Sequence, residues 1–310
     1  MGNTPYSNFF LSNEAEDQFD SRLALERFCK VDSSLEGTAG MTRKINVYSA
    51  TDGTQKLTKG NGNTQSIEVG YVQKTYEILL AQNRFQYYDE EFMEDPFLPV
   101  VGARHAGIDM FNTINADIYG EFAKATHVLP VAALSFDAFA DAQAMLNQET
   151  ALETFAFVCP ADVAKLRKAL KDDLKYVEAF ARQGYIGTVA GTNIHMKKNA
   201  TPGSIYLATP EAVTLFVKTG TEVEQSVKGN RSSADENVRI NTLITRKYYL
   251  AALTDATKDI KILVGATASA TADTSVQTGT TYYEKATVGY IEVVPEAGDN
   301  PASEGWYVIS

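Results

Sequence analysis

The sequence predicts an α+β fold, and three observations lead to this prediction. A stretch of 25 residues, from about Ala103 to His127, has the apolar spacing of one long helix. Strand-like segments occur on both sides of it, but they do not alternate regularly with helices. The 310 residues are 44% hydrophobic and 22% charged, which is typical of a globular protein. Because the order of elements is irregular, we expect separate helical and sheet layers instead of a parallel βαβ sheet.

The chain begins with a predicted arm, residues 1–40, containing one helix over about Glu14–Val31. Ile45–Ser49 then alternates as a strand, and a second strand starts at Ile67 and ends near Gln73. Between these strands, residues 54–66 are polar and rich in glycine and asparagine, so they cannot bury a core of their own. We therefore expect a long protruding β-hairpin with a mobile tip.

The predicted long helix follows a strand-like stretch, Thr75–Gln82, and the acidic run Asp89–Asp95. At about 1.5 Å per residue the helix would be roughly 37 Å long, so it would act as a spine for the fold. One face of it carries five apolar side chains and one amide: Ile108, Phe111, Asn115, Ile118, Phe122 and Ala125.

The second half of the chain mixes short helices and strands. The predicted helices are Asp137–Asn147, Ala161–Lys171 and one capped by Thr209-Pro210. The predicted strands are Thr154–Val158, Ser204–Ala208, Glu222–Val227, Val238–Leu253 and Asp259–Val264. The composition then shifts to alanine, threonine and serine over residues 266–278, which predicts a linker. Tyr282–Val294 and Trp306–Ile309 predict a terminal β-hairpin.

The net charge excludes some classes of protein. With 28 basic and 39 acidic side chains the formal charge is −11, which is unsuited to coating DNA or an anionic membrane surface. The first residues carry acids where a signal peptide needs a basic start, and no apolar run reaches the ~18 residues of a membrane span. We therefore expect the protein in the cytoplasm, or in an assembly built there, and no membrane partner.

Catalytic and cofactor motifs are missing from the sequence. His105, His127 and His195 are far apart and in no paired-ligand spacing, and Cys29 and Cys159 have no partner at metal-ligand spacing. There is no nucleophile elbow, phosphate-binding loop or CxxC pair. We therefore predict that the protein is not an enzyme and has no cofactor or metal.

The acidic run Asp89–Asp95 has three interpretations. It could be a solvated face, a site for a divalent cation, or a surface complementary to a basic partner. It lacks the alternating ligands of an EF-hand loop.

The order of elements resembles that of tailed-phage major capsid proteins, whose fold is shared with encapsulins. The resemblance covers roughly residues 10–265 and rests on segments that follow one another in the family's order. These are Thr75–Asp95, Ala103–His127, Thr154–Pro160, Gly184–Asn193 and Ala234–Val238.

The resemblance implies a division of the chain into domains. They would be the N-terminal arm 1–40, the extended hairpin loop 41–75, the peripheral domain with its spine helix (76–130 and 236–265), the axial domain 131–235, and a linker with a C-terminal hairpin extension, 266–310. No fused scaffolding segment is expected, because only about 40 residues precede the loop.

The resemblance also implies a function. The chain would be a major capsid protein that assembles in the host cytoplasm, through pentamers and hexamers, into an icosahedral virion shell. Scaffolding and portal proteins would be its partners, and the shell would enclose double-stranded DNA without reading its sequence. An encapsulin-type compartment that encloses protein cargo is the alternative. An acidic wall suits a DNA container, since it repels phosphates and leaves the packaged DNA mobile.

Charge is unevenly distributed between two of these segments and predicts a contact between subunits. Residues 41–75 have a net charge of +3, whereas 76–130 have −6. We expect the loop of one subunit to dock on the peripheral domain of its neighbour. The candidate interface residues are Arg43, Lys44, Lys56, Leu57, Lys59 and Lys74 on the loop, and Glu90, Glu91, Glu94 and Asp95 on the platform.

Overall fold

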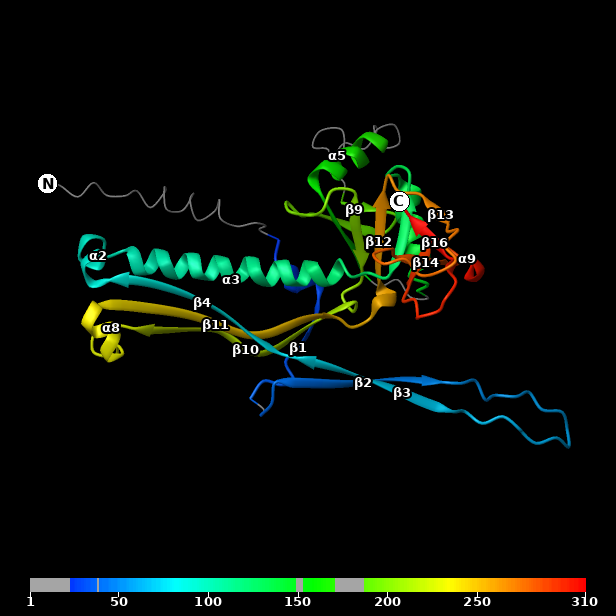
Figure 1. Ribbon diagram of the computed structural model, residues 1–310, viewed down its shortest axis with the longest axis horizontal. Coiled ribbons are helices and arrows are strands. Elements are labelled where there is room, and N and C mark those ends of the chain that lie inside the picture. The colour runs from blue at the N-terminus through cyan, green and yellow to red at the C-terminus, as the bar shows by residue number, and fades with distance from the viewer. Residues whose placement is uncertain (1–22, 38, 149–152, 171–186) are drawn as a thin grey trace.

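The computed structural model describes residues 23–37, 39–148, 153–170 and 187–310. Its mixture of helices and sheets confirms the predicted α+β class. Figure 1 shows a long helix over one sheet at one end, a second sheet at the other end, and a hairpin that projects beyond both.

The first layer pair is a four-stranded sheet with the long helix α3 (Leu98–Phe122) packed along it. The strand order is β1-β10-β11-β4, and the bounds are β1 Lys30–Asp32, β10 Val213–Ser226, β11 Ile240–Leu253 and β4 Leu79–Tyr88. Ile118 and Phe122 of α3 are fully buried in a core that includes Leu215 and Ala251 of the sheet. This packing holds the spine helix in place (Figure 1).

The second sheet has ten strands in the order β13-β16-β14-β15-β5-β12-β9-β6-β8-β7. Their bounds are β5 His127–Val131, β6 Thr154–Val158, β7 Thr188–Val189, β8 Thr192–Met196, β9 Ser204–Ala208, β12 Asp259–Val264, β13 Ala268–Ala270, β14 Tyr282–Lys285, β15 Tyr290–Val293 and β16 Tyr307–Ile309. The predicted strands 154–158, 204–208 and 259–264 are confirmed residue for residue.

Strand β6 shows how the second sheet joins two cores. Phe155 and Phe157 face the core that contains α3, whereas Ala156 and Val158 face a core formed with α4 (Phe136–Met145) and α5 (Pro160–Ala169). Because both faces of the strand are buried, its sequence is a continuous apolar run instead of an alternating one.

Helix α3 has the predicted length of 25 residues but begins five residues earlier than expected, at Leu98. Pro99 stands in its first turn, where the missing N–H of proline costs no helical hydrogen bond. The helix ends at Phe122, and His127 opens β5 instead of closing the helix. The one amide on the apolar face, Asn115, is buried and holds the arm, accepting a hydrogen bond from the backbone N–H of Leu25 at 3.0 Å.

The predicted hairpin is confirmed and longer than expected. Strands β2 (Thr42–Ala50) and β3 (Val69–Glu77) pair antiparallel over nine residues each. At the base of the hairpin, the Tyr76 ring stacks on Phe216 of β10 at 5.0 Å between centroids. Among the described residues, the hairpin is therefore anchored at the end next to the four-stranded sheet (Figure 1).

Two local predictions were wrong where other contacts outweigh the local pattern, and the acidic run has a structure that was not predicted. In its described part, the expected helix Glu14–Val31 is a 3₁₀ turn, η1 (Leu25–Phe28), followed by β1, which pairs with β10; residues 14–22 lie outside the described residues. The acidic run, for which no secondary structure was predicted, forms a short helix, α2 (Asp89–Glu94), and the Glu91 carboxylate accepts the Tyr88 N–H at its start. No helix follows Thr209-Pro210, because the chain turns there into β10.

The loop between β10 and β11 contains a helix that the sequence did not lead us to expect. Helix α8 (Ser233–Val238) begins at Ser232, whose hydroxyl accepts a hydrogen bond from the Asp235 N–H at 3.2 Å.

The sheet pairings differ from the predicted domain boundaries. β10, expected in the axial segment 131–235, pairs with β11 and β1 under the spine helix, and β12 belongs to the ten-stranded sheet. The predicted linker 266–278 contains β13, which pairs with β16. The C-terminal hairpin is β14–β15, and β15 pairs with β5, so the extension continues the large sheet. The remaining elements are η2 (Ala256–Lys258) and α9 (Pro301–Glu304).

Candidate assembly interface

The strands of the hairpin expose apolar side chains on both faces. Val47 is paired with Val72 on one face, and Tyr48 with Tyr71 on the other. These four side chains are between 46% and 68% exposed. A two-stranded ribbon without a covered face is marginal alone, and exposed apolar groups in such numbers mark an interaction surface.

The tip of the hairpin combines one apolar side chain with two lysines. Leu57 is 49% exposed, and Lys56 and Lys59 on either side of it are exposed. The tip is held by local hydrogen bonds, such as the Asn63 side-chain amide to the Gly53 carbonyl at 2.9 Å. The tip therefore presents one exposed leucine side chain with two positive charges beside it.

The other basic candidates divide into exposed residues and one bonded residue. Lys44 and Lys74 are exposed on the strands of the hairpin. Arg43 forms an ion pair with Asp32 of β1, with 3.5 Å between Nε and Oδ2, so it braces the base of its own hairpin.

The acidic candidates lie together on and next to α2, and most are bonded within their own chain. Glu90 pairs with Arg239 at 3.1 Å, and the Glu91 carboxylate accepts the Tyr88 N–H at 2.9 Å. Asp95 accepts the Phe97 N–H at 2.9 Å, whereas Glu94 is exposed. Figure 1 places α2 at the end of the molecule opposite the hairpin tip, so the structure does not bring the basic and acidic candidates together within one chain.

A guanidinium that the sequence did not single out holds the α2 end together. The Arg231 side chain, only 1% exposed, donates to Asp89 at 2.5 Å and to Asn241 at 2.8 Å. These hydrogen bonds hold the pKa of the Asp89 carboxyl below its usual range. The pairing joins α2, β11 and the loop before α8.

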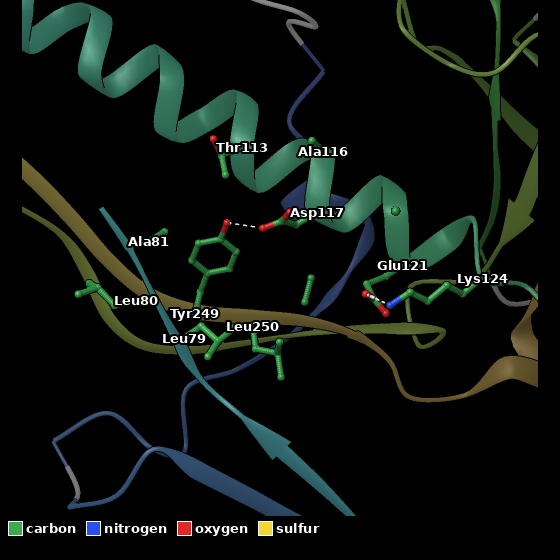
Figure 2. Close-up of a pocket in the computed structure, with 12 residues that line it drawn as sticks. Leu79, Leu80, Ala81, Thr113, Ala116, Asp117, Glu121, Lys124, Tyr249 and Leu250 are labelled. Atoms are coloured by element: carbon green, nitrogen blue, oxygen red, sulfur yellow. Dashed lines mark hydrogen bonds and ion pairs between the residues drawn. The ribbon is translucent and has the colours of Figure 1, made fainter. Parts of the chain in front are cut away.

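A groove between α3, β4 and β11 is the second feature that the sequence did not reveal (Figure 2). Its volume is about 480 Å³, and its walls include Leu79, Leu80 and Leu250. Small residues of α3, Ala116 and Gly120, form the opposite side. These two small residues are four positions apart and therefore lie on one helix face. This spacing is the sequence signal that could have predicted a hollow on that face.

Two carboxylates line the same groove. Asp117 accepts a hydrogen bond from the Tyr249 hydroxyl at 2.6 Å, and Glu121 pairs with Lys124, as the dashed lines in Figure 2 show. Burial, together with the neighbouring Asp117, raises the pKa of Tyr249, so this phenol stays neutral and keeps donating its proton.

The titratable residues considered for catalysis have structural environments. Burial raises the pKa of the Cys29 thiol to about 12, so it is unreactive at neutral pH. Burial also lowers the pKa of His127 and of His195, whose ring packs on Phe28 at 4.6 Å. Within the described ranges, no three His, Cys, Asp or Glu side chains are grouped to hold a metal ion. No helix in that same part of the chain is long and apolar enough to cross a bilayer.

A spine helix on a four-stranded sheet, a second sheet at its end and a protruding hairpin together define the capsid fold of tailed phages, and the chain has this fold. Solved structures similar to it include the capsid of cyanophage P-SCSP1u, with a TM-score of 0.61 and 11% identity over 76% of this chain and 86% of that chain. Mycobacterium phage Che8 gives 0.58 and 16%, covering 75% and 88%.

A third similar structure comes from an archaeon. It is a virus-like particle from Pyrococcus furiosus, with a TM-score of 0.50 and 15% identity, and the match covers 82% of this chain and 99% of that chain. No protein-family profile matches the sequence, and no curated protein matches it significantly.

Proposed function

We propose that the chain is the major capsid protein of a tailed bacteriophage and that it assembles through pentamers and hexamers into a closed icosahedral shell. The likeness to phage capsids supports this proposal at the level of the fold. The observation that carries it further is the hairpin, whose exposed valines and tyrosines need a partner surface that the described residues of their own chain do not provide.

The arrangement of the chain suits assembly between subunits. The hairpin tip and the α2 end lie at opposite ends of the molecule (Figure 1), so a contact between them must join two copies. A contact of this head-to-tail kind repeats from copy to copy and closes into rings when the rotation between copies allows it. Pentamers and hexamers are such rings.

The content of the shell would be double-stranded DNA. A chain with a net charge of −11 would repel phosphates from the wall instead of binding them, which leaves DNA free to enter and leave. Scaffolding and portal proteins are the partners that such a shell would need for its size and for DNA entry. We place assembly in the host cytoplasm and the finished protein in the virion.

An encapsulin-type compartment with protein cargo is the second candidate function. The match that extends over 99% of the archaeal virus-like particle favours it. The two functions differ in what the shell contains.

Electron microscopy of particles from the producing cells, followed by nuclease treatment and extraction, tests both functions. Closed shells that protect double-stranded DNA are the expected result. Shells that protect a cargo protein and no DNA would support the compartment instead. Monomers or open tubes at every concentration would contradict both.

A further inference from the structure

The groove lined by Leu79, Leu80, Leu250 and Gly120 has the chemistry of a receptor for a short apolar side chain with cations beside it. One wall is aliphatic and accessible, since Leu79 and Leu80 of the edge strand β4 line the groove and are 62% and 44% exposed. Its carboxylates, Asp117 and Glu121, outnumber the single cation Lys124. An occupant that buries an aliphatic group and brings positive charge would satisfy both features.

The hairpin tip has the complementary chemistry. Leu57 is exposed, and Lys56 and Lys59 stand one and two positions away from it. Together these three residues offer one aliphatic side chain and two ammonium groups. Lysine side chains are long and flexible, so the ammonium groups can reach carboxylates in several geometries.

The tip cannot occupy the groove of its own chain. Strand β3 ends at Glu77, two residues before Leu79 in the groove wall, and its nine residues rise about 3.4 Å each away from that point. The tip is therefore about 30 Å or more from the groove of its own chain. Figure 1 shows β2 and β3 running away from the four-stranded sheet.

We propose that the groove between α3, β4 and β11 receives Leu57 from the hairpin tip of a second copy, with Lys56 and Lys59 lying against Asp117 and Glu121. This inference rests on the proposed function and names the receptor surface that the assembly would use. It also names a partner for the tip other than the carboxylates of α2. Carboxylates at both places already have partners within their own chain, so the aliphatic lining that would bury Leu57 is what favours the groove.

Cross-linking with a matched control tests the contact. A cysteine replacing Gly120 would point into open space, and Gly107 on the same helix is equally open but does not line the groove. Assembled shells of the Leu57→Cys, Gly120→Cys chain are treated with a short bis-maleimide, and so are shells of the Leu57→Cys, Gly107→Cys chain. The natural cysteines, Cys29 and Cys159, are buried. We expect linked oligomers from the first pair and at least fivefold fewer from the second.

Filling the groove tests the contact independently of cross-linking. Gly120→Phe should raise the concentration needed for assembly roughly tenfold or more, because the phenyl ring would fill the groove and Leu57 could no longer be buried there. A loss of affinity of this size is expected when one leucine per contact stays exposed. Gly107→Phe should change that concentration less than twofold. Circular dichroism and the melting temperature of the isolated subunits show that each variant folds.

The outcomes separate the groove from the function. Shells of the two double-cysteine chains in which position 57 links equally to 107 and 120, or to neither, would overturn the groove as receptor and leave the capsid function standing. Normal assembly of Gly120→Phe would overturn it as well. A wild-type chain that never forms shells would overturn the proposed function, and this inference with it.

Discussion

Asp259 is the residue whose surroundings are least favourable to its charge. It is fully buried at the start of β12, and neither carboxyl oxygen has a hydrogen-bond partner among the described residues. Ala208 is its partner in β9, which places the carboxyl on the same sheet face as Tyr206, toward the core that contains α3. Burial therefore raises the pKa of Asp259 well above its usual value.

Asp259 should make the folded subunit less stable as the pH rises. The unfolded chain releases the proton near pH 3.9, whereas the folded chain retains it to a higher pH, so the free energy of unfolding falls between the two pKa values. Asp259→Asn should remove this fall. Urea unfolding from pH 4 to 8 should show a variant that gains stability over wild type as the pH rises. A difference between Asp259→Asn and wild type that stays constant with pH would contradict the prediction.

Arg231 should be the most important cation for the stability of the α2 end. Its guanidinium donates to both Asp89 and Asn241. Arg231→Lys keeps the positive charge but lacks the planar group that bonds both acceptors at once, so it should lower the urea midpoint of unfolding. Because the pKa of Asp89 is lowered, this contribution is present at neutral pH and is lost as the pH falls through that pKa. Glu90→Gln removes only an exposed ion pair with Arg239, so it should change the urea midpoint very little. Equal effects of the two changes would contradict the role of Arg231.

Two glycines of α3 test how the spine helix packs on its sheet. A Cβ at Gly102 would lie 2.3 Å from the Phe85 ring of β4, whereas Gly107 faces open space. Gly102→Ala should therefore destabilise the subunit by about 1–3 kcal/mol, because the ring or the helix must shift. Gly107→Ala should stabilise it by about 0.5–1 kcal/mol, since alanine favours helix. Thermal unfolding measures both, and a stabilising Gly102→Ala would show that α3 lies farther from β4.

The elements predicted from sequence are those with strong periodic or continuous apolar patterns. Strand β6 was recognised as a short continuous apolar run, and the spine helix because its buried side chains recur every three or four residues. Strand β1 was missed because Lys30–Asp32 has no strand pattern and is extended only through pairing with Thr214–Phe216. The groove was missed because its walls come from three elements far apart in the chain.

The hairpin tip should be the first site of proteolysis in the free subunit. Residues 54–66 bury almost no apolar surface and are held mainly by local hydrogen bonds, so they can open without unfolding the rest. Trypsin should cut after Lys56 or Lys59 before it cuts after Lys74, which lies within the paired strand β3. Assembled shells should resist this cleavage, as mass spectrometry of the fragments would show. Equal cleavage of the tip in subunits and shells would mean that the tip stays uncovered.

At the scale of the whole molecule, charge and shape favour contacts between copies over contacts within one. The basic hairpin projects beyond the second sheet, and the acidic α2 end lies at the opposite end (Figure 1). A shell repeats the same contact at every interface, so contributions of ~0.2–1 kcal/mol from single exposed pairs accumulate in the assembly. Assembly should therefore respond to charge changes that leave the isolated subunit unaffected.

Reversing the charge of the tip should weaken assembly without unfolding the subunit. We expect the Lys56→Glu, Lys59→Glu chain to keep the wild-type melting temperature, because both side chains are exposed, and to assemble poorly at low salt. Light scattering should show that the defect shrinks as salt screens the repulsion.

A Lys168→Glu, Lys285→Glu chain makes the same change in net charge at exposed positions away from the hairpin, so it should assemble like wild type. Adding Glu90→Lys and Glu91→Lys to the tip variant should restore assembly only if α2 is the partner. Assembly that ignores both the tip reversal and ionic strength would leave apolar contacts such as Leu57 as the force that holds the loop to its neighbour.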